Sequence, residues 1–152
     1  MVEQGDTAPD FDLAADDGGR VRLQDLSGRR VVIYFYPKDD TPGCTTQACD
    51  LRDSRPRFAS LDAVVLGISP DSTDSHVRFR EKFDLNFPLL SDPDHAVAQA
   101  YGVWKEKTNY GRKYLGIERS TFVIDAQGRI ERAWRKVSPK GHAELVSAYL
   151  EE

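Results

Sequence analysis

The sequence predicts an α/β fold with a mixed central sheet flanked by helices and an N-terminal β-hairpin. Two runs of β-branched and aromatic residues, 31–36 and 63–69, have the composition of strands buried on both faces of a sheet. Helical spacing follows each run, and turn residues predict a tight hairpin late in the chain. At the usual ~100–200 residues per domain, 152 residues predict one domain over 1–152.

Composition excludes several classes of protein. The 21 basic and 25 acidic residues give a formal charge of −4, so we expect no nucleic acid and no anionic membrane as partner. No apolar run approaches the ~20 residues that span a bilayer. The N-terminal residues lack the basic and apolar regions of a secretory signal, which makes a cytoplasmic location the default expectation. Two cysteines are too few for a disulfide scaffold.

The first predicted elements are an edge hairpin and a buried strand. Apolar and polar residues alternate over 11–13 and 21–23, on either side of the turn residues 16–19. We expect this hairpin to cover one edge of the sheet. The run 31–36 follows as a central strand, and Pro37 ends it because proline cannot donate a backbone hydrogen bond.

A helix is predicted directly after this strand. Thr41 suits the N-cap and Pro42 the first helical position. Cys44, Ala48 and Leu51 then fall on one face at i, i+4 and i+7. The hydroxyl of Thr41 has two open roles, since it can cap the helix or meet a ligand.

The middle of the chain alternates strand and helix. Pro56 should kink or end the first helix, because it removes a hydrogen bond and clashes with the preceding turn. The run 63–69 is the second strand, and a helix is predicted over 72–83. A short helix over 93–101 is expected to be capped by Asp92. The inward-facing positions predicted on these two helices are Val77, Phe79, Phe83, Val97, Ala100 and Tyr101.

The last elements decide between two α/β folds. Strands are predicted over 120–125 and 129–134, joined by a turn at 126–128, and a helix over 142–150 closes the chain. A doubly wound parallel sheet would not end in an antiparallel hairpin. The order therefore favours a thioredoxin-like fold.

Cys44 is the candidate nucleophile. A thiol in the first turn of a helix meets unpaired backbone N–H groups and the positive end of the helix dipole, which favour the thiolate. Cys49 lies five residues further, and Cα atoms at that spacing on a helix are ~8–9 Å apart. A disulfide needs ~4.4–6.8 Å, so Cys44 and Cys49 can pair only if the helix unwinds.

Other interpretations of the two cysteines are less specific. A helical cysteine is more often a small buried apolar residue, which remains the simplest interpretation of Cys49 taken alone. A zinc site would need further ligands at regular spacing, and His76, His95 and His142 are scattered. A CxxC dithiol exchanger has two intervening residues, whereas this chain has four.

The segment from Pro37 to Cys49 resembles the peroxiredoxins. Pro37, Thr41 and Cys44 match the PxxxTxxC signature, and TPGCTTQAC followed by Leu-Arg-Asp resembles the bacterioferritin comigratory protein branch, or Q-type peroxiredoxins. Further similar stretches lie near the N-terminus and over 66–69, 87–92, 101–104 and 119–125. The resemblance implies a thioredoxin-like fold and a thiol peroxidase that reduces hydrogen peroxide and organic hydroperoxides.

The resemblance also implies a role for each matching residue. Cys44 corresponds to the peroxidatic cysteine, whose thiolate attacks the O–O bond and becomes a sulfenic acid. Thr41 corresponds to the threonine that hydrogen-bonds peroxide and thiolate, and Pro37 to the proline that shields the site. Arg119 corresponds to the arginine that stabilises the thiolate and the charge developing on the peroxide. Gln47 stands where many relatives have Glu.

Cys49 corresponds to the resolving cysteine that this branch often carries in the same helix. It would form a disulfide with Cys44, and reduced thioredoxin or a glutaredoxin-like partner would restore the dithiol. The resemblance implies no metal, flavin or haem, and a monomer with a dimer as the alternative. Two other hypotheses stay open, a general dithiol–disulfide oxidoreductase and a non-catalytic redox sensor or holdase.

Overall fold

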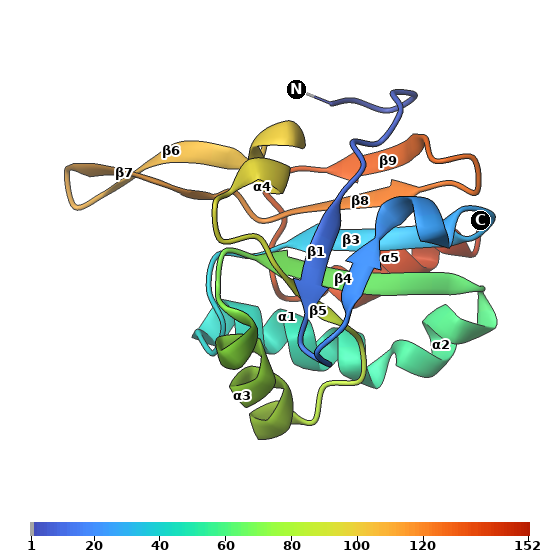
Figure 1. Ribbon diagram of the computed structural model, residues 1–152, viewed down its shortest axis with the longest axis horizontal. Helices are drawn as coiled ribbons and strands as arrows, with labels where there is room; N and C mark the ends of the chain where they lie inside the picture. Colours follow the sequence, from blue (N-terminus) through green and yellow to red (C-terminus); the bar gives the residue numbers. More distant parts are fainter. Residues whose placement is uncertain (1) are drawn as a thin grey trace.

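The computed structural model describes residues 2–152 and contains two sheets (Figure 1). The main, seven-stranded sheet has the spatial order β2 (Arg20–Arg22), β1 (Asp12–Ala15), β5 (Leu89–Ser91), β4 (Ala63–Ser69), β3 (Arg30–Phe35), β8 (Ser120–Ile124) and β9 (Ile130–Trp134). β4 pairs in parallel with β3 and β5, and the other neighbours are antiparallel. The second sheet is the hairpin of β6 (Trp104–Asn109) and β7 (Arg112–Ile117).

Helices cover both faces of the main sheet. Their bounds are η1 (Leu23–Leu26, a 3-10 helix), α1 (Pro42–Asp53), α2 (Arg55–Ser60), α3 (Thr73–Phe83), α4 (Ala96–Ala100) and α5 (His142–Leu150). The core on one face contains buried residues of α1, α2, α3 and α5, and the core on the other contains those of η1 and α4. This mixed sheet between helical layers is the thioredoxin-like arrangement that the sequence predicts.

Strand β3 separates the two cores because its side chains alternate between the faces. Ile33 and Phe35 belong to the core beside α4, whereas Val32, Tyr34 and Tyr36 belong to the core beneath α1 and α5. All of these residues are buried, which explains why the run 31–36 is apolar without alternation. The pairing of β3 with β4 and β8 makes it a central strand, and the loop 37–41 joins its carboxyl end to α1.

Most predicted elements are confirmed within one or two residues. β1 and β2 form the edge hairpin, and β8 and β9 form the late hairpin with Gly128 at a φ of 82°. α1 ends at Asp53, and α2 starts with Pro56 in its first turn, as expected of a proline at this point.

The prediction for 93–101 is partly wrong. The helix begins at Ala96 and not at Pro93, because His95 adopts a left-handed conformation with a φ of 62°. Asp92 still accepts hydrogen bonds from helix N–H groups, those of Val97 and Ala98. Ala98 is buried on this helix, whereas Ala100, predicted to face inward, is exposed.

The sequence does not predict three of the strands, β5, β6 and β7. β5 has only three residues, too few for a periodic signal to appear. β6 and β7 are rich in charged residues, and they project from the body of the molecule as a long hairpin (Figure 1). Tyr110 at the tip is 98% exposed. Because this hairpin buries little of either face, apolar alternation could not reveal it.

Candidate active site

The first turn of α1 presents Cys44 at the end of the central strand. Thr41 is the N-cap residue, Pro42 is the first helical residue and Cys44 is the third, so the thiol lies among the unpaired N–H groups of the helix start. Cys44 is only 2% exposed. Pro37 is half-buried directly after Tyr36, whose N–H makes a last bond to Ile68 before the chain leaves the sheet.

The structure separates the two roles left open for Thr41. Its backbone has the extended conformation of an N-cap, yet its side chain makes no capping hydrogen bond. The hydroxyl instead donates to the carbonyl oxygen of Lys38 at 2.9 Å. Because the proton is used in this way, the lone pairs of the hydroxyl oxygen are left to accept a hydrogen bond.

Arg119 is brought to Cys44 from a distant part of the chain. It lies between β7 and β8, and its Nη2 donates to the Sγ of Cys44 at 3.3 Å. Its Nη1 donates to Oε1 of Gln47 at 2.6 Å. A guanidinium at this distance stabilises negative charge on sulfur and on atoms that react with it.

Gly43 allows this close approach. A Cβ atom at Gly43 would lie 3.3 Å from Nη2 of Arg119 and 3.3 Å from Cγ of Pro139. Any larger residue would therefore crowd the guanidinium that contacts Cys44. This explains in steric terms why the sequence places glycine immediately before the cysteine.

Cys49 lies on α1 with Cys44, but no disulfide bond joins the two residues. Both cysteines are free, and α1 is continuous from Pro42 to Asp53. Cys49 is partly exposed, unlike the buried Cys44. With an intact helix between them, the two sulfurs cannot bond, and pairing requires the local unwinding that the spacing predicts.

Four polar residues near the site have contacts that the sequence does not predict. Gln47, which stands where many relatives have Glu, accepts a hydrogen bond from Arg119 through its amide oxygen. Asp39, in the loop that precedes α1, is hydrogen-bonded to Asp71 through its backbone N–H and to His76 through its carboxylate. A signal for the two aspartates was available, since both follow the carboxyl ends of neighbouring parallel strands, which meet at one edge of a sheet.

Buried polar groups beneath α1 stay uncharged. Burial, together with the nearby Arg119, lowers the pKa of His142 to about 4, and its Nε2 lies 2.6 Å from the hydroxyl of Thr121. Burial raises the pKa of Tyr34 well above its ordinary value. Lys107, on β6, has a lowered pKa because of burial and the neighbouring Arg119 guanidinium. The positive charge in contact with Cys44 is that of the Arg119 guanidinium, which donates a hydrogen bond to the sulfur.

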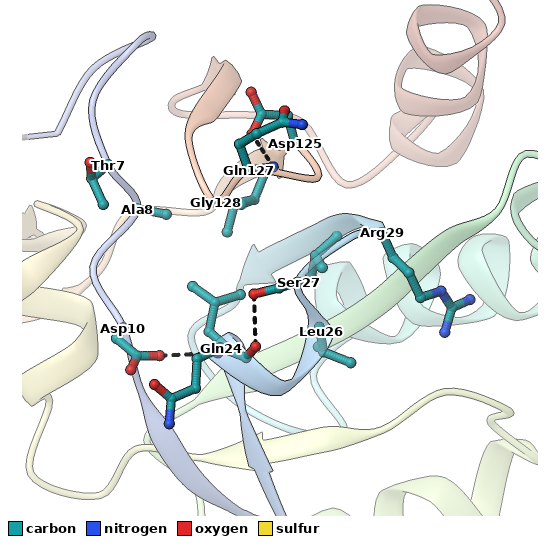
Figure 2. A pocket seen from close by; sticks show the side chains of 13 residues that line it. Thr7, Ala8, Asp10, Gln24, Leu26, Ser27, Arg29, Asp125, Gln127 and Gly128 are labelled. Carbon is teal, nitrogen blue, oxygen red and sulfur yellow. Dashed lines mark hydrogen bonds between the residues drawn. The ribbon is translucent and has the colours of Figure 1, made fainter.

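Two hollows have different relations to Cys44. One opens between the β6–β7 hairpin and Arg119, with Lys107, Tyr114 and Val137 among its lining residues. Another, shown in Figure 2, lies between the N-terminal segment, η1 and the β8–β9 turn. It contains no cysteine and touches β3 at Val31, the end of the strand opposite the site. Of these two hollows, only the first is lined by Arg119, the residue that contacts Cys44.

A thioredoxin-like sheet with a cysteine in the first turn of the helix after its central strand, and an arginine on that cysteine, defines a thiol-based redox enzyme. The family model described as the AhpC/TSA family matches residues 4–133. "Peroxiredoxin Bcp" of Bacillus subtilis is 55% identical over 141 residues, covering 93% of this chain and 90% of the relative. "Peroxiredoxin Bcp" of Escherichia coli is 47% identical, covering 99% and 97%.

Solved structures agree with the sequence comparison. A Xanthomonas campestris bacterioferritin comigratory protein, solved for its alkyl peroxide reduction activity, has a TM-score of 0.89 at 45% identity over 93% of this chain and 90% of that chain. A Xylella fastidiosa PrxQ variant has a TM-score of 0.94 at 41% identity, covering 99% and 96%. The chain belongs to the AhpC/TSA family, in its Bcp or Q-type peroxiredoxin branch.

Membership of this branch makes the chain a thiol-dependent peroxidase. Within residues 2–152, none of the helices is long and apolar enough to cross a membrane.

Proposed function

We propose that the chain, acting as one domain, reduces hydrogen peroxide and organic hydroperoxides with Cys44 as nucleophile and Cys49 as resolving cysteine. The observation that carries this assignment is the 3.3 Å contact from Arg119 Nη2 to Cys44 Sγ at the start of α1. The helix dipole and the guanidinium both place positive charge beside the Cys44 sulfur, where the peroxide must bind.

In the first step, the Cys44 thiolate attacks one oxygen of the hydroperoxide. An S–O bond forms as the O–O bond breaks, and the leaving alkoxide or hydroxide takes a proton to become an alcohol or water. Arg119 stabilises the charge on the leaving oxygen. Thr41 accepts a hydrogen bond from the hydroperoxide O–H, since its own proton is donated to Lys38. Pro37 shields the site on the side of the loop.

In the second step, the thiol of Cys49 attacks the sulfur of the Cys44 sulfenic acid and water leaves. The resulting disulfide requires α1 to unwind between the two cysteines, since helical spacing holds their Cα atoms ~8–9 Å apart. A dithiol reductant then returns both cysteines to thiols and is itself oxidised to a disulfide. We propose thioredoxin for this reductant, with a glutaredoxin-like protein as the alternative, and a cytoplasmic monomer that needs no metal or cofactor.

The test compares peroxide consumption by the wild-type chain, Cys44→Ser and Cys49→Ser with thioredoxin and its reductase. The Cys44 variant should consume no peroxide, and the Cys49 variant should react once and stop. Mass spectrometry of the wild type after one equivalent of peroxide should show a Cys44–Cys49 disulfide, lighter by two hydrogens. Retained activity in Cys44→Ser contradicts the assignment, and disulfide reduction on insulin without peroxide use would favour a general oxidoreductase.

A further inference from the structure

The peptide unit between Lys38 and Asp39 is held on both sides. Its carbonyl accepts the Thr41 hydroxyl at 2.9 Å, and its N–H donates to Oδ2 of Asp71 at 2.8 Å. A trans peptide is planar, and its C=O and N–H point in opposite directions. The Asp71 carboxylate therefore fixes the orientation of the carbonyl that receives the Thr41 proton.

The side chain of Asp39 also restrains this peptide unit, because its carboxylate is hydrogen-bonded to neighbouring side chains. It is buried, and its carboxylate accepts hydrogen bonds from Tyr36 Oη at 2.5 Å and Ser75 Oγ at 2.8 Å. The Nδ1 of His76, a fully buried residue, lies 2.7 Å from Oδ2 of Asp39. Three protein groups thus hold one loop carboxylate, which restricts the rotation of the loop backbone at Asp39.

The partners of this loop are themselves anchored to the sheet. Nε2 of His76 lies 3.0 Å from the carbonyl oxygen of Leu90, so this nitrogen must donate. The hydroxyl of Ser69 donates to Oδ2 of Asp71 at 2.8 Å, and that of Ser91 to the Asp71 carbonyl at 2.6 Å. The cluster therefore ties the loop to β4 and β5 as well as to α3.

The hydrogen bonds within this cluster explain why Asp39, Asp71 and His76 lie close together, and no bound cation is needed to hold them. Asp39, Asp71 and His76 have ligand-type atoms within 4.8 Å of one another. Oδ2 of Asp71, however, already accepts hydrogen bonds from the Asp39 N–H and the Ser69 hydroxyl. The cluster serves as a clamp on the peptide.

We propose that Asp71, Asp39 and His76 are positioning residues that select the peroxide-binding orientation of the Thr41 hydroxyl. The competing orientation is the ordinary one for an N-cap threonine, in which its oxygen accepts an N–H of the first helical turn. That orientation would use the lone pairs that the hydroperoxide O–H needs. The inference rests on the proposed roles of Cys44 and Thr41.

The test uses a Cys49→Ser background, in which oxidation of Cys44 stops at the sulfenic acid. Two rate constants are measured for Cys44, oxidation by hydrogen peroxide and alkylation by iodoacetamide, which needs the thiolate but has no hydroperoxide to orient. Asp71→Ala should slow oxidation by about tenfold, as expected when a reactant is misplaced, and leave alkylation within about twofold. Asp71→Asn keeps an oxygen acceptor for the Asp39 N–H and should restore the oxidation rate.

Two further variants make the outcome decisive. In a Thr41→Val background, Asp71→Ala should cause no further loss, because the group it positions is already absent. Asp16→Asn is the matched control, since Asp16 is a buried carboxylate that pairs with Arg80 of α3, the helix that also contains His76, and accepts from the Leu89 N–H, but forms no hydrogen bond or ion pair with residues 37–41. It should leave both rates unchanged. If Asp71→Ala does not fold, Ser69→Ala removes one anchor of Asp71 and should lower oxidation alone.

The inference is overturned if Asp71→Ala oxidises at the rate of its Cys49→Ser parent, if both rates fall together, or if the losses in the Thr41→Val background are additive. Failure of the proposed function is a separate result. It would appear in the Cys49→Ser parent itself, as the absence of sulfenic acid at Cys44 when trapped with dimedone.

Discussion

The chain on the two sides of Cys44 is held in different ways. The loop before it, residues 37–41, is fixed by hydrogen bonds that join Asp39 to Asp71, just after β4, and to Ser75 and His76 of α3. The helix after it is held mainly by apolar burial of Ala48 and Leu51, and it ends at Asp53 before a proline. Buried hydrogen bonds fix directions closely, whereas apolar contacts are non-directional.

This difference matches the two demands of the chemistry. The peroxide must meet donors and acceptors in fixed positions, which the loop supplies. The disulfide requires α1 to open between Cys44 and Cys49, and apolar contacts, which fix no direction, can be remade as the helix moves. We therefore expect changes on the loop side to alter the oxidation of Cys44, and changes on the helix side to alter the later formation of the disulfide.

Cys49→Ser should give the largest effect of these variants. It should abolish formation of the disulfide, the step that depends on the helix side, and leave oxidation of Cys44 unchanged. The variant lacks the thiol that condenses with the sulfenic acid, so the intramolecular disulfide should be absent and turnover with thioredoxin should stop. Oxidation of Cys44 itself should keep its rate because the side-chain hydrogen bonds that hold Asp39 and Thr41 in the loop do not involve Cys49. Stopped-flow oxidation followed by mass spectrometry measures both steps, and continued thioredoxin-dependent turnover would show that another group resolves Cys44.

Arg119→Ala removes the contact that joins the two sides. Nη2 to Cys44 and Nη1 to Gln47 are both lost, so oxidation by hydrogen peroxide should fall by roughly 10²-fold, the usual cost of an oxyanion donor. Unlike Asp71→Ala, it should also slow alkylation, because the thiolate loses its partner. Arg135→Ala is the control, since Arg135 donates to backbone carbonyls of Val2, Tyr101 and Gly102, and its rates should match the wild type.

The sequence predicts the helix side of the site better than the loop side. The positions of Thr41, Pro42 and Cys44 at a helix start depend on neighbouring residues alone, and the structure confirms them. The Asp39–His76 contact joins residues 37 apart, which are brought together by the pairing of β3 with β4 and by the packing of α3 against β5. Local patterns contain no such information.

The limits of local sequence patterns also explain which strands are predicted and which are not. The strands 31–36 and 63–69 are buried on both faces, so composition alone predicts them. β5 is short, and β6 and β7 are exposed and charged, so neither length nor periodicity indicates a strand. Arg119 could be selected only through family resemblance, because nothing in its local sequence separates it from a solvated surface arginine.

His142 offers a pH test of the helix side. It is the first residue of α5, whose buried face belongs to the same core as that of α1, and its pKa is about 4 against an ordinary value of 6.5. Between these values the unfolded chain binds a proton that the folded chain excludes, so stability falls as pH falls. From pH 7 to pH 5 the free energy of unfolding should drop by about 2 kcal/mol because of this residue.

Denaturant unfolding of the wild type and His142→Gln at both pH values measures this contribution. Glutamine does not titrate in this range, so the variant should lose about 2 kcal/mol less than the wild type over the interval. Equal losses in the two proteins would mean that His142 accepts a proton in the folded state as readily as in the unfolded one.

Pro56→Ala should give the smallest effect, confined to the opening of α1. Proline cannot donate to the carbonyl of Arg52, which instead accepts a hydrogen bond from Asn86 Nδ2 at 3.2 Å. Alanine restores a donor that can extend α1 into α2, so unwinding becomes less favourable by the ~1 kcal/mol of one net backbone hydrogen bond, or about fivefold in rate.

The matched measurement monitors both steps after one equivalent of peroxide. Sulfenic acid formation at Cys44 should be unchanged in Pro56→Ala, because residue 56 lies far along the chain from the loop, while formation of the Cys44–Cys49 disulfide should slow. Equal disulfide rates in both proteins would show that the break at Pro56 does not set the cost of unwinding. The helix contacts around Arg52 would then be the next to alter, since Arg52 Nη1 also holds the carbonyl of Phe83 at 2.6 Å.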